Sequence, residues 1–193
     1  MDVVPEALIV AGPNGAGKTT FAREFIIKHP RKYISADDIA EELSPTHPPR
    51  SYIQAGRQFF RKLEEQIIEG ESFITEVTLA GVGFLNLMSR MVERGYSITI
   101  VFVYLDSSNT CIERIRERVR KGGHDVPVPD ILRRFHRSID NFWARYCLVA
   151  HQWYLVYNST MEFKGVAFGE RDRTVAVLDE ILFREFLALT SGR

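Results

Sequence analysis

The strongest constraint on this chain is a glycine-rich segment at residues 12–19, which lies between the apolar run 7–11 and the helix-like stretch 18–28. The segment matches the pattern G-x-x-x-x-G-K-[ST] at every fixed position. Its glycines let backbone N–H groups curl around phosphate oxygens, and the following helix turns its positive N-terminal end toward them. We therefore predict a strand, a phosphate-binding loop and a helix; the alternative is a tight turn that happens to end in Lys-Thr.

The residues of this phosphate loop have separate predicted roles. Lys18 is expected to reach the β- and γ-phosphates of ATP, and the Thr19 hydroxyl is expected to bind Mg²⁺. ATP and Mg²⁺ are thus the predicted cofactors. The residues predicted to bind the nucleotide are Gly12, Pro13, Asn14, Gly15, Ala16, Gly17, Lys18, Thr19 and Thr20.

Apolar runs and helical stretches alternate along the whole chain, which is typical of an α/β fold with a mostly parallel sheet. The predicted strands are 7–11, 32–35, 72–76, 98–105 and 153–157, with a hairpin at 164–177. The predicted helices are 18–28, 37–43, 50–69, 84–94, 108–121, 129–146 and 178–189, and residues 44–49 break the second of them. The long helix 50–69 is expected to bury a stripe at Ile53, Gly56, Phe60, Leu63 and Ile67.

These elements predict one domain, 1–193, with the three-layer P-loop NTPase fold of nucleotide kinases. A lid that carries arginines is expected at about 118–134.

Acidic residues stand where two predicted strands end. Because the carboxyl ends of parallel strands face one crevice, Asp37 and Glu76 should converge on the phosphate loop. Asp37 is the predicted base that accepts a proton from a substrate hydroxyl, with Asp38 as its rival, although both could instead cap the helix that begins there. Glu76 and Thr78 are predicted to contact the substrate. Asp106, after strand 98–105, is a weaker candidate for an Mg²⁺ ligand and is read as a helix cap.

Arginines flank a glycine pair at residues 122–123, as in a mobile lid that closes over a transferring phosphoryl group. One or two of them should enter the site, while the rest pair with nearby glutamates on a solvated helix face. The cluster could alternatively contact RNA. However, the chain has 25 basic and 25 acidic residues, so its formal net charge is zero. The protein as a whole therefore does not attract nucleic acid or an anionic membrane electrostatically.

Other classes lack their signatures in this sequence. The Asn-Lys-x-Asp and Asp-x-x-Gly motifs of GTPases are missing. The two cysteines show no metal-ligand spacing and are expected to be reduced thiols. No signal peptide or membrane span is evident, so the expected location is the cytoplasm.

Several segments resemble the zeta-toxin-like kinases. They are the phosphate loop, the run Ser35-Ala36-Asp37-Asp38, the run Thr75-Glu76-Val77-Thr78, and the run Gly122-Gly123-His124-Asp125-Val126-Pro127 with Arg133-Arg134-Phe135 downstream. The resemblance implies that Asp37 is the base, Glu76 the substrate-binding acid and Lys18 the phosphate lysine. Catalytic lid arginines fall on Arg118 and Arg134, with Arg120 and Arg133 as competitors.

The same resemblance implies that the γ-phosphoryl group of ATP moves to the 3′-hydroxyl of UDP-N-acetylglucosamine, and it raises an antitoxin protein as a possible partner. The chain is shorter than the larger toxins and is similar to the compact branch, whose acceptors the resemblance does not define. We therefore predict a kinase for a small-molecule hydroxyl. The alternatives are another acceptor, such as a nucleoside, sugar or antibiotic, and a nucleotide-dependent switch that binds RNA or protein.

Overall fold

The computed structural model describes residues 4–43, 52–160 and 162–190, so the predicted helix break at 44–49 lies outside the described residues. A seven-stranded sheet forms its centre, in the order β2-β3-β1-β4-β5-β6-β7. The strands from β2 to β5 run parallel, whereas β6 and β7 are antiparallel. Within the described ranges, no helix is long and apolar enough to cross a membrane.

The elements follow the predicted order closely. The strands are β1 Glu6–Ala11, β2 Lys32–Ile34, β3 Phe73–Val77, β4 Ser97–Tyr104, β5 Gln152–Tyr157, β6 Lys164–Glu170 and β7 Arg173–Val177. The helices are α1 Lys18–Lys28, α2 Ala36–Leu43, α3 Tyr52–Glu69, α4 Gly83–Glu93, α5 Ser108–Arg120, α6 Val128–Asn141, the π-helix η2 Phe142–Tyr146, α7 Cys147–Val149 and α8 Glu180–Thr190.

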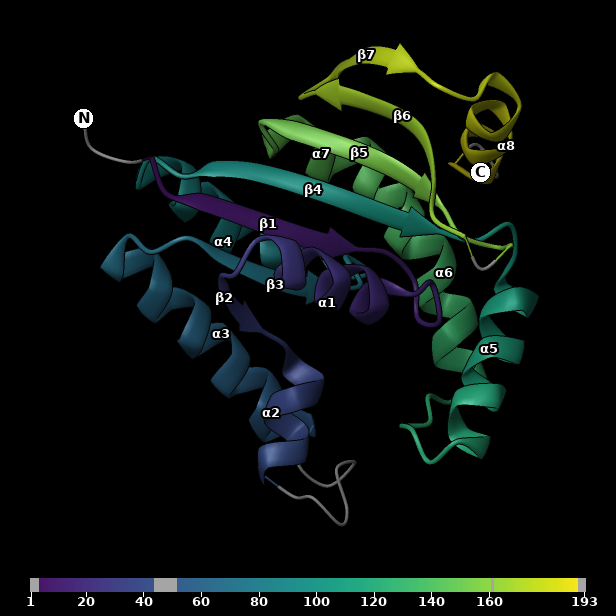
Figure 1. Ribbon diagram of the computed structural model, residues 1–193, viewed down its shortest axis with the longest axis horizontal. Coiled ribbons are helices and arrows are strands. Elements are labelled where there is room, and N and C mark those ends of the chain that lie inside the picture. Colours follow the sequence, from purple (N-terminus) through teal and green to yellow (C-terminus); the bar gives the residue numbers. More distant parts are fainter. Residues whose placement is uncertain (1–3, 44–51, 161, 191–193) are drawn as a thin grey trace.

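Helices cover both faces of the sheet. In Figure 1, α1 lies in front of the strands, while α4, α6 and α7 lie behind them. The predicted three-layer α/β arrangement with a mostly parallel sheet is therefore confirmed. The predicted hairpin is confirmed as well, since β6 and β7 pair with each other.

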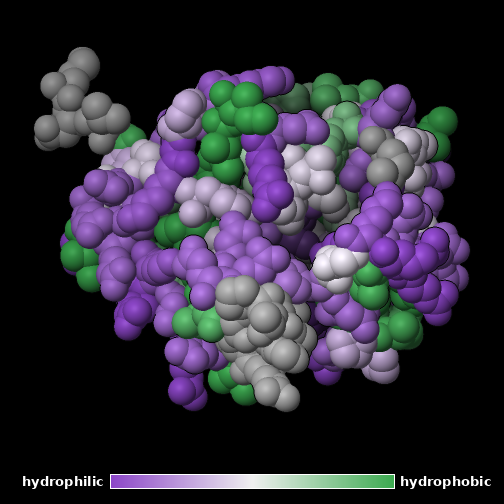
Figure 2. All heavy atoms as spheres, turned by 60° about the horizontal axis from the view of Figure 1, so that its bottom comes forward, coloured by the Kyte–Doolittle hydropathy of each residue, from purple (hydrophilic) through white to green (hydrophobic). Residues whose placement is uncertain are grey.

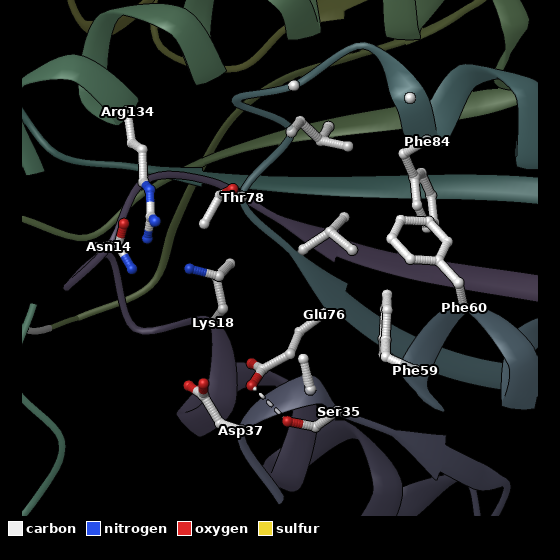
Figure 3. Close-up of a pocket in the computed structure, with 15 residues that line it drawn as sticks. Asn14, Lys18, Ser35, Asp37, Phe59, Phe60, Glu76, Thr78, Phe84 and Arg134 are labelled. Carbon is white, nitrogen blue, oxygen red and sulfur yellow. Dashed lines mark hydrogen bonds between the residues drawn. The ribbon is translucent and has the colours of Figure 1, made fainter. Parts of the chain in front are cut away.

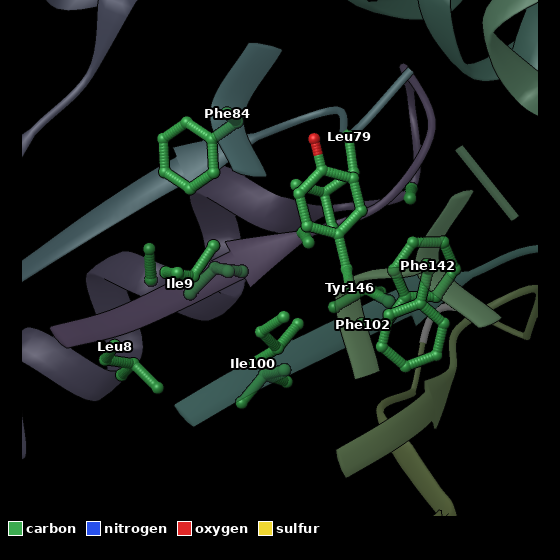
Figure 4. Close-up of a cluster of buried hydrophobic side chains, with 14 of the residues drawn as sticks. Leu8, Ile9, Leu79, Phe84, Ile100, Phe102, Phe142 and Tyr146 are labelled. Atoms are coloured by element: carbon green, nitrogen blue, oxygen red, sulfur yellow. The ribbon is translucent and has the colours of Figure 1, made fainter. Parts of the chain in front are cut away.

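The central strands β1 and β4 are buried on both faces, which is why they read as continuous apolar runs rather than alternating ones. Behind the sheet, the ring of Phe102 in β4 stacks on Phe142, with ring centroids 4.1 Å apart. Figure 4 shows this pair beside Ile100, with Tyr146 reaching toward Leu79. The buried strands and the aromatic layer hold the carboxyl ends of β1, β3 and β4 in fixed relative positions.

The buried face of α3 differs from the predicted stripe. Ile53 is 78% exposed and Phe60 is 42% exposed, so neither packs in the core. The helix instead buries Ala55, Phe59, Leu63, Gln66 and Ile67. Phe59 and Phe60 stand side by side in the sequence, and the helical period placed Phe60 in the stripe, whereas the helix buries Phe59.

A second difference concerns the predicted helix 129–146. The regular helix α6 ends at Asn141, and the next five residues form the π-helix η2. Near this change, the Asn141 side-chain amide donates to Leu79 O at 2.9 Å and the Tyr146 hydroxyl donates to Gly81 O at 2.6 Å. Leu79 has a positive φ of 56°, which a non-glycine residue rarely adopts. The two bonds thus fix the loop that follows β3.

Both cysteines are free and buried, in agreement with the prediction of reduced thiols. Burial raises the pKa of the Cys111 thiol to about 12. Because the thiolate is the reactive form, this cysteine is expected to be chemically inert.

The backbone at Gly12 generates a prediction about stability. A Cβ added there would lie 2.0 Å from Val103 O, at a φ of 139°. We therefore expect Gly12→Ala to lower the free energy of unfolding by about 1–3 kcal/mol, as overpacking does. Among the described residues, nothing would lie within 4 Å of a Cβ added at Gly56 in α3, and Gly56→Ala should raise that free energy by about 0.5–1 kcal/mol. Urea unfolding of both variants measures the difference, and equal stabilities would contradict the close approach.

Candidate active site

The phosphate loop lies against its neighbours so closely that only glycine fits at its turns. Gly15 and Gly17 have φ values of 81° and 98°. An added Cβ would lie 2.9 Å from Cys111 O at Gly15 and 2.5 Å from Asn158 Nδ2 at Gly17. The loop is therefore wedged between α5 and the end of β5, with its backbone N–H groups at the start of α1. In the described part of the chain no side chain caps that helix start, which leaves its positive end available to an anion.

Asn158 supports the loop from behind. Its amide nitrogen donates to Ala16 O at 2.7 Å, and the residue is only 4% exposed. Asn158 directly follows β5, so it occupies a strand end just as the predicted acids do. Asn158 was not among the predicted site residues, although the rule that polar residues at strand ends face the crevice points to it.

Lys18 is the first residue of α1 and is half-buried where the loop meets this helix. Its Nζ donates to Pro13 O at 3.0 Å. Burial lowers its pKa below the ordinary value, while the negative charges of Glu76 and Asp37 act in the opposite direction. A desolvated ammonium beside unfilled backbone donors is well suited to bind phosphate oxygens.

Thr19 and Glu76 connect the loop to β3. The Thr19 hydroxyl lies 2.9 Å and 3.1 Å from the two Glu76 carboxylate oxygens, and the Ser35 hydroxyl lies 3.3 Å from Oε1. The register of the sheet causes this meeting, because Glu76 in β3 stands beside Val10 in β1. Glu76 is only 9% exposed. The expected convergence of Glu76 on the phosphate loop is therefore present.

The two adjacent aspartates have different surroundings. Ser35 accepts a hydrogen bond from Asp38 N at 3.4 Å and so takes the capping position of α2 that the sequence analysis offered to the aspartates. Asp38 Oδ1 lies 3.9 Å from Arg23 Nη2. Asp37 instead lines a cavity together with Lys18 and Glu76. Of the two rivals, Asp37 is the one that faces Lys18.

That cavity has a volume of about 340 Å³ and two unlike ends. Figure 2 shows the side of the molecule that faces down in Figure 1, where hydrophilic side chains surround a hollow. In Figure 3, the polar side chains gather at one end of the cavity and the rings at the other, with Thr78 and Glu76 between them. The polar end is formed by Asn14, Lys18, Asp37 and Arg134, and the rings are those of Phe59, Phe60 and Phe84.

The predicted lid arginines lie on two sides of the phosphate loop. Arg118 lines a recess of about 190 Å³ that also contains Lys18 and Thr19. It donates from Nε and Nη2 to His124 O, at 3.0 Å and 2.6 Å, and so holds the loop after α5. That loop reaches across to α2, since His124 Nε2 lies 3.2 Å from Glu41 Oε1. Arg134 lines the 340 Å³ cavity from α6.

Arg133 and Arg120 are the competitors of Arg134 and Arg118, and neither lines the 340 Å³ cavity or the 190 Å³ recess. Arg133 is exposed and lies 2.9 Å from Asp130 Oδ1. Arg120 is exposed and lines a broad groove of about 1360 Å³ beside α5, as does Thr20.

Asp106 is exposed and accepts a hydrogen bond from the Thr110 hydroxyl at 2.7 Å, whereas the adjacent Ser107 caps α5. The prediction that Asp106 is the cap is therefore wrong, and Glu76 is the acid beside Thr19.

Arg114 is a further arginine that the sequence analysis did not select. It lines both the phosphate recess and the broad groove. Its Nη2 donates to Ser159 O at 3.2 Å and also to Asn158 O. Its position on the inner face of α5, one turn before Arg118, is the signal that could have identified it.

Comparison with known proteins places the fold among kinases. Residues 8–140 match the profile of the family described as AAA domain. A shikimate kinase from Rhodococcus jostii is 31% identical over 129 residues, which are 66% of this chain and 70% of that protein. An uncharacterized protein from Haemophilus influenzae is 29% identical over 121 residues, which are 63% of this chain and 86% of that protein.

Two solved structures share the fold over nearly the whole chain. The AvrRxo1-ORF1:-ORF2 structure with ATP gives a TM-score of 0.74 at 15% identity and covers 98% of this chain, which spans only 64% of the matched chain. The PezAT chromosomal toxin–antitoxin system of Streptococcus pneumoniae gives 0.64 at 15% identity, over 95% of this chain and 78% of the matched one.

At such identities the likeness concerns the fold alone, so membership of the narrower zeta-toxin family stays a prediction. The family profile, in contrast, covers well over half of the sequence. The chain therefore belongs to the AAA domain family, as a nucleotide-binding P-loop domain of the kinase-like type.

Proposed function

We propose that this protein is an ATP-dependent kinase that transfers the γ-phosphoryl group to a hydroxyl of a small molecule. One observation carries the proposal: Lys18 of the phosphate loop and the carboxylate of Asp37 line the same cavity. A phosphate on Lys18 and a hydroxyl beside Asp37 would then be neighbours. Kinase chemistry requires mainly this positioning, together with charges that stabilise the transferring group.

In the proposed reaction, the acceptor oxygen forms a bond to the γ-phosphorus while the bond from that phosphorus to the β–γ bridging oxygen breaks. ADP leaves with the electrons of the broken bond, and the proton of the hydroxyl passes to Asp37. Asp37 is exposed to the cavity, and none of the described residues forms a hydrogen bond with its carboxylate. It is thus free to accept that proton.

The residues around Thr19 fit a magnesium ion. Mg²⁺ is usually held by one or two protein oxygens, by substrate phosphates and by water. The Thr19 hydroxyl and the Glu76 carboxylate supply oxygens within 3.1 Å of each other. When bound there, the ion would neutralise charge on the β- and γ-phosphates. Glu76 would orient the water molecules bound to the ion, or the acceptor. Thr78, in the middle of the cavity, would contact the acceptor.

The arginines are proposed to surround the phosphates. Arg118 would approach from the lid side and Arg134 from the acceptor side, with Arg114 beside the recess. Guanidinium groups in a water-poor site stabilise the charge that spreads over the transferring oxygens. We propose the groove beside Gly17 and Asn158 for the adenosine portion of ATP, because it opens directly next to the phosphate loop.

The identity of the acceptor and of any protein partner stays a prediction. UDP-N-acetylglucosamine is the acceptor implied by the zeta-toxin resemblance, and an antitoxin is the implied partner. A cytoplasmic location and a single domain over 1–193 are proposals as well. The alternative, a nucleotide-dependent switch that binds RNA through α5, predicts salt-dependent RNA binding without phosphoryl transfer.

Lys18 provides a test of nucleotide binding. We expect Lys18→Met to weaken binding of a non-hydrolysable ATP analogue by roughly 10–100-fold, because it removes a charge-assisted contact of about 1.5–3 kcal/mol. The control is Lys28→Met, at the exposed end of the same helix, which should bind normally. Calorimetric titration measures both, and equal loss in the two variants would point to a general effect on α1.

Asp37 provides the test of catalysis. The wild-type protein is incubated with γ-labelled ATP, Mg²⁺ and a panel of sugar nucleotides, nucleosides and small sugars, and labelled product identifies an acceptor. With that acceptor, we expect Asp37→Asn to lower kcat by roughly 10²–10⁴-fold while the affinity for the ATP analogue is nearly unchanged.

Asp38→Asn is the matched control, because Asp38 faces Arg23 rather than the cavity. It should keep nearly full kcat. The reverse result would make Asp38 the base, and full turnover in both variants would remove general-base catalysis from the account.

A further inference from the structure

The aromatic end of the cavity has no part in phosphoryl transfer. Phe59 and Phe60 come from α3, and Phe84 comes from the first turn of α4. The centroids of Phe59 and Phe60 lie 5.5 Å apart, and those of Phe60 and Phe84 lie 6.4 Å apart. Single exposed apolar residues are common on protein surfaces. Three rings that converge on one end of a cavity form instead an apolar wall for a ligand.

Phe60 departs most from a packing role. Its neighbour Phe59 is buried in the core, whereas Phe60 leaves a large part of its ring uncovered. Figure 3 shows Phe60 beside Phe84 at the end of the cavity opposite Asp37. A ring held between an apolar neighbour and open space can stack on the flat face of a ligand.

Charged groups gather at the other end. Among the described residues that line the cavity, the cations are Lys18 and Arg134, and both lie at the polar end. Both face the position proposed for the phosphates and would be engaged there by ATP. The carboxylate of Asp37 lies at the same polar end, and the carboxylate of Glu76 lies between the cations and the rings. An acceptor that carries a carboxylate or phosphate would therefore be repelled by these carboxylates. Both cations among the described lining residues would already bind ATP, so neither would be left to neutralise the charge of the acceptor.

The middle of the cavity suits neutral polar groups. Thr78 and Ser35 present hydroxyls there, and the Ser35 hydroxyl already bonds to Glu76. An added Cβ at Gly81 or Gly83, which also line the cavity, would meet none of the described residues within 4 Å. Next to these two glycines the wall therefore leaves open space at the backbone.

We propose, building on the kinase function above, that the acceptor is an uncharged alcohol that bears an aromatic or heteroaromatic ring. The ring lies against Phe60 and Phe84, and the hydroxyl group to be phosphorylated reaches Asp37. Nucleosides and phenyl-substituted alcohols share this chemistry. Sugar acids and sugar nucleotides do not, because they carry negative charge.

The test compares acceptors of both kinds in the wild-type protein. Uridine and 1-phenyl-1,3-propanediol represent the two neutral sources, while gluconate, shikimate and UDP-N-acetylglucosamine represent charged acceptors. Steady-state transfer from labelled ATP gives kcat/KM for each, and ligand-observed NMR gives binding without turnover. We expect a neutral aromatic alcohol to have the highest kcat/KM. If uridine is the better of the two, the natural acceptor is a nucleoside; if 1-phenyl-1,3-propanediol is better, it is a phenyl-substituted alcohol.

Variants of α3 then test the site of binding. Phe60→Ala should raise the KM for the neutral acceptor by roughly tenfold, the loss expected when a ring contact and its buried area are removed, with little change in kcat. Phe60→Tyr keeps the ring and should keep the KM. Ile68→Ala removes another exposed apolar side chain from the same helix, away from the cavity, and should have no effect.

The outcomes separate this proposal from the kinase function. Higher kcat/KM for a charged acceptor, or an unchanged KM in Phe60→Ala, overturns the neutral aromatic acceptor while the kinase function stands. Binding of the aromatic alcohols that Phe60→Ala abolishes, without transfer to any acceptor, supports the aromatic site and overturns the kinase function. Failure of every aromatic alcohol to bind overturns the proposal made here.

Discussion

The close packing of the phosphate loop against β4, α5 and Asn158 is the constraint on which the rest of the site depends. Added Cβ atoms at Gly12, Gly15 and Gly17 would lie 2.0–2.9 Å from atoms of these neighbours. The loop is thus held in place by direct backbone contact, with Asn158 bonded to its Ala16 carbonyl. This rigidity keeps the donors of the loop in position before any phosphate arrives, which lowers the entropic cost of binding.

The acceptor side is held by a different part of the chain. Helix α6 carries Arg134 at its middle and Asn141 at its end, and the π-helix that follows carries Tyr146. Asn141 and Tyr146 bond to the loop after β3, which forms one wall of the cavity. A single helical segment therefore connects an arginine at the phosphate end to the wall around the acceptor. A π-helix within such a segment is frequently associated with a functional site.

The sequence predicted those features that follow from local pattern. The phosphate loop, the succession of strands and helices along the chain, and the convergence of Asp37 and Glu76 on that loop all come from rules about local pattern, turns and strand ends. It placed Phe60 rather than Phe59 in the core, because a helical period accommodates either residue and the choice depends on how α3 rotates against its neighbours. It also did not indicate that Ser35 rather than an aspartate caps α2, or that a π-helix follows Asn141, since these depend on tertiary contacts.

The central claim is that the loop around Lys18 holds a triphosphate whose terminal group faces Asp37 across the cavity. A crystal structure with a non-hydrolysable ATP analogue and Mg²⁺ tests this most directly. The account predicts the β-phosphate within the curl of residues 12–19, the metal beside Thr19 and Glu76, and the γ-phosphate directed toward Asp37. An empty loop, or a γ-phosphate that points away from Asp37, would contradict it.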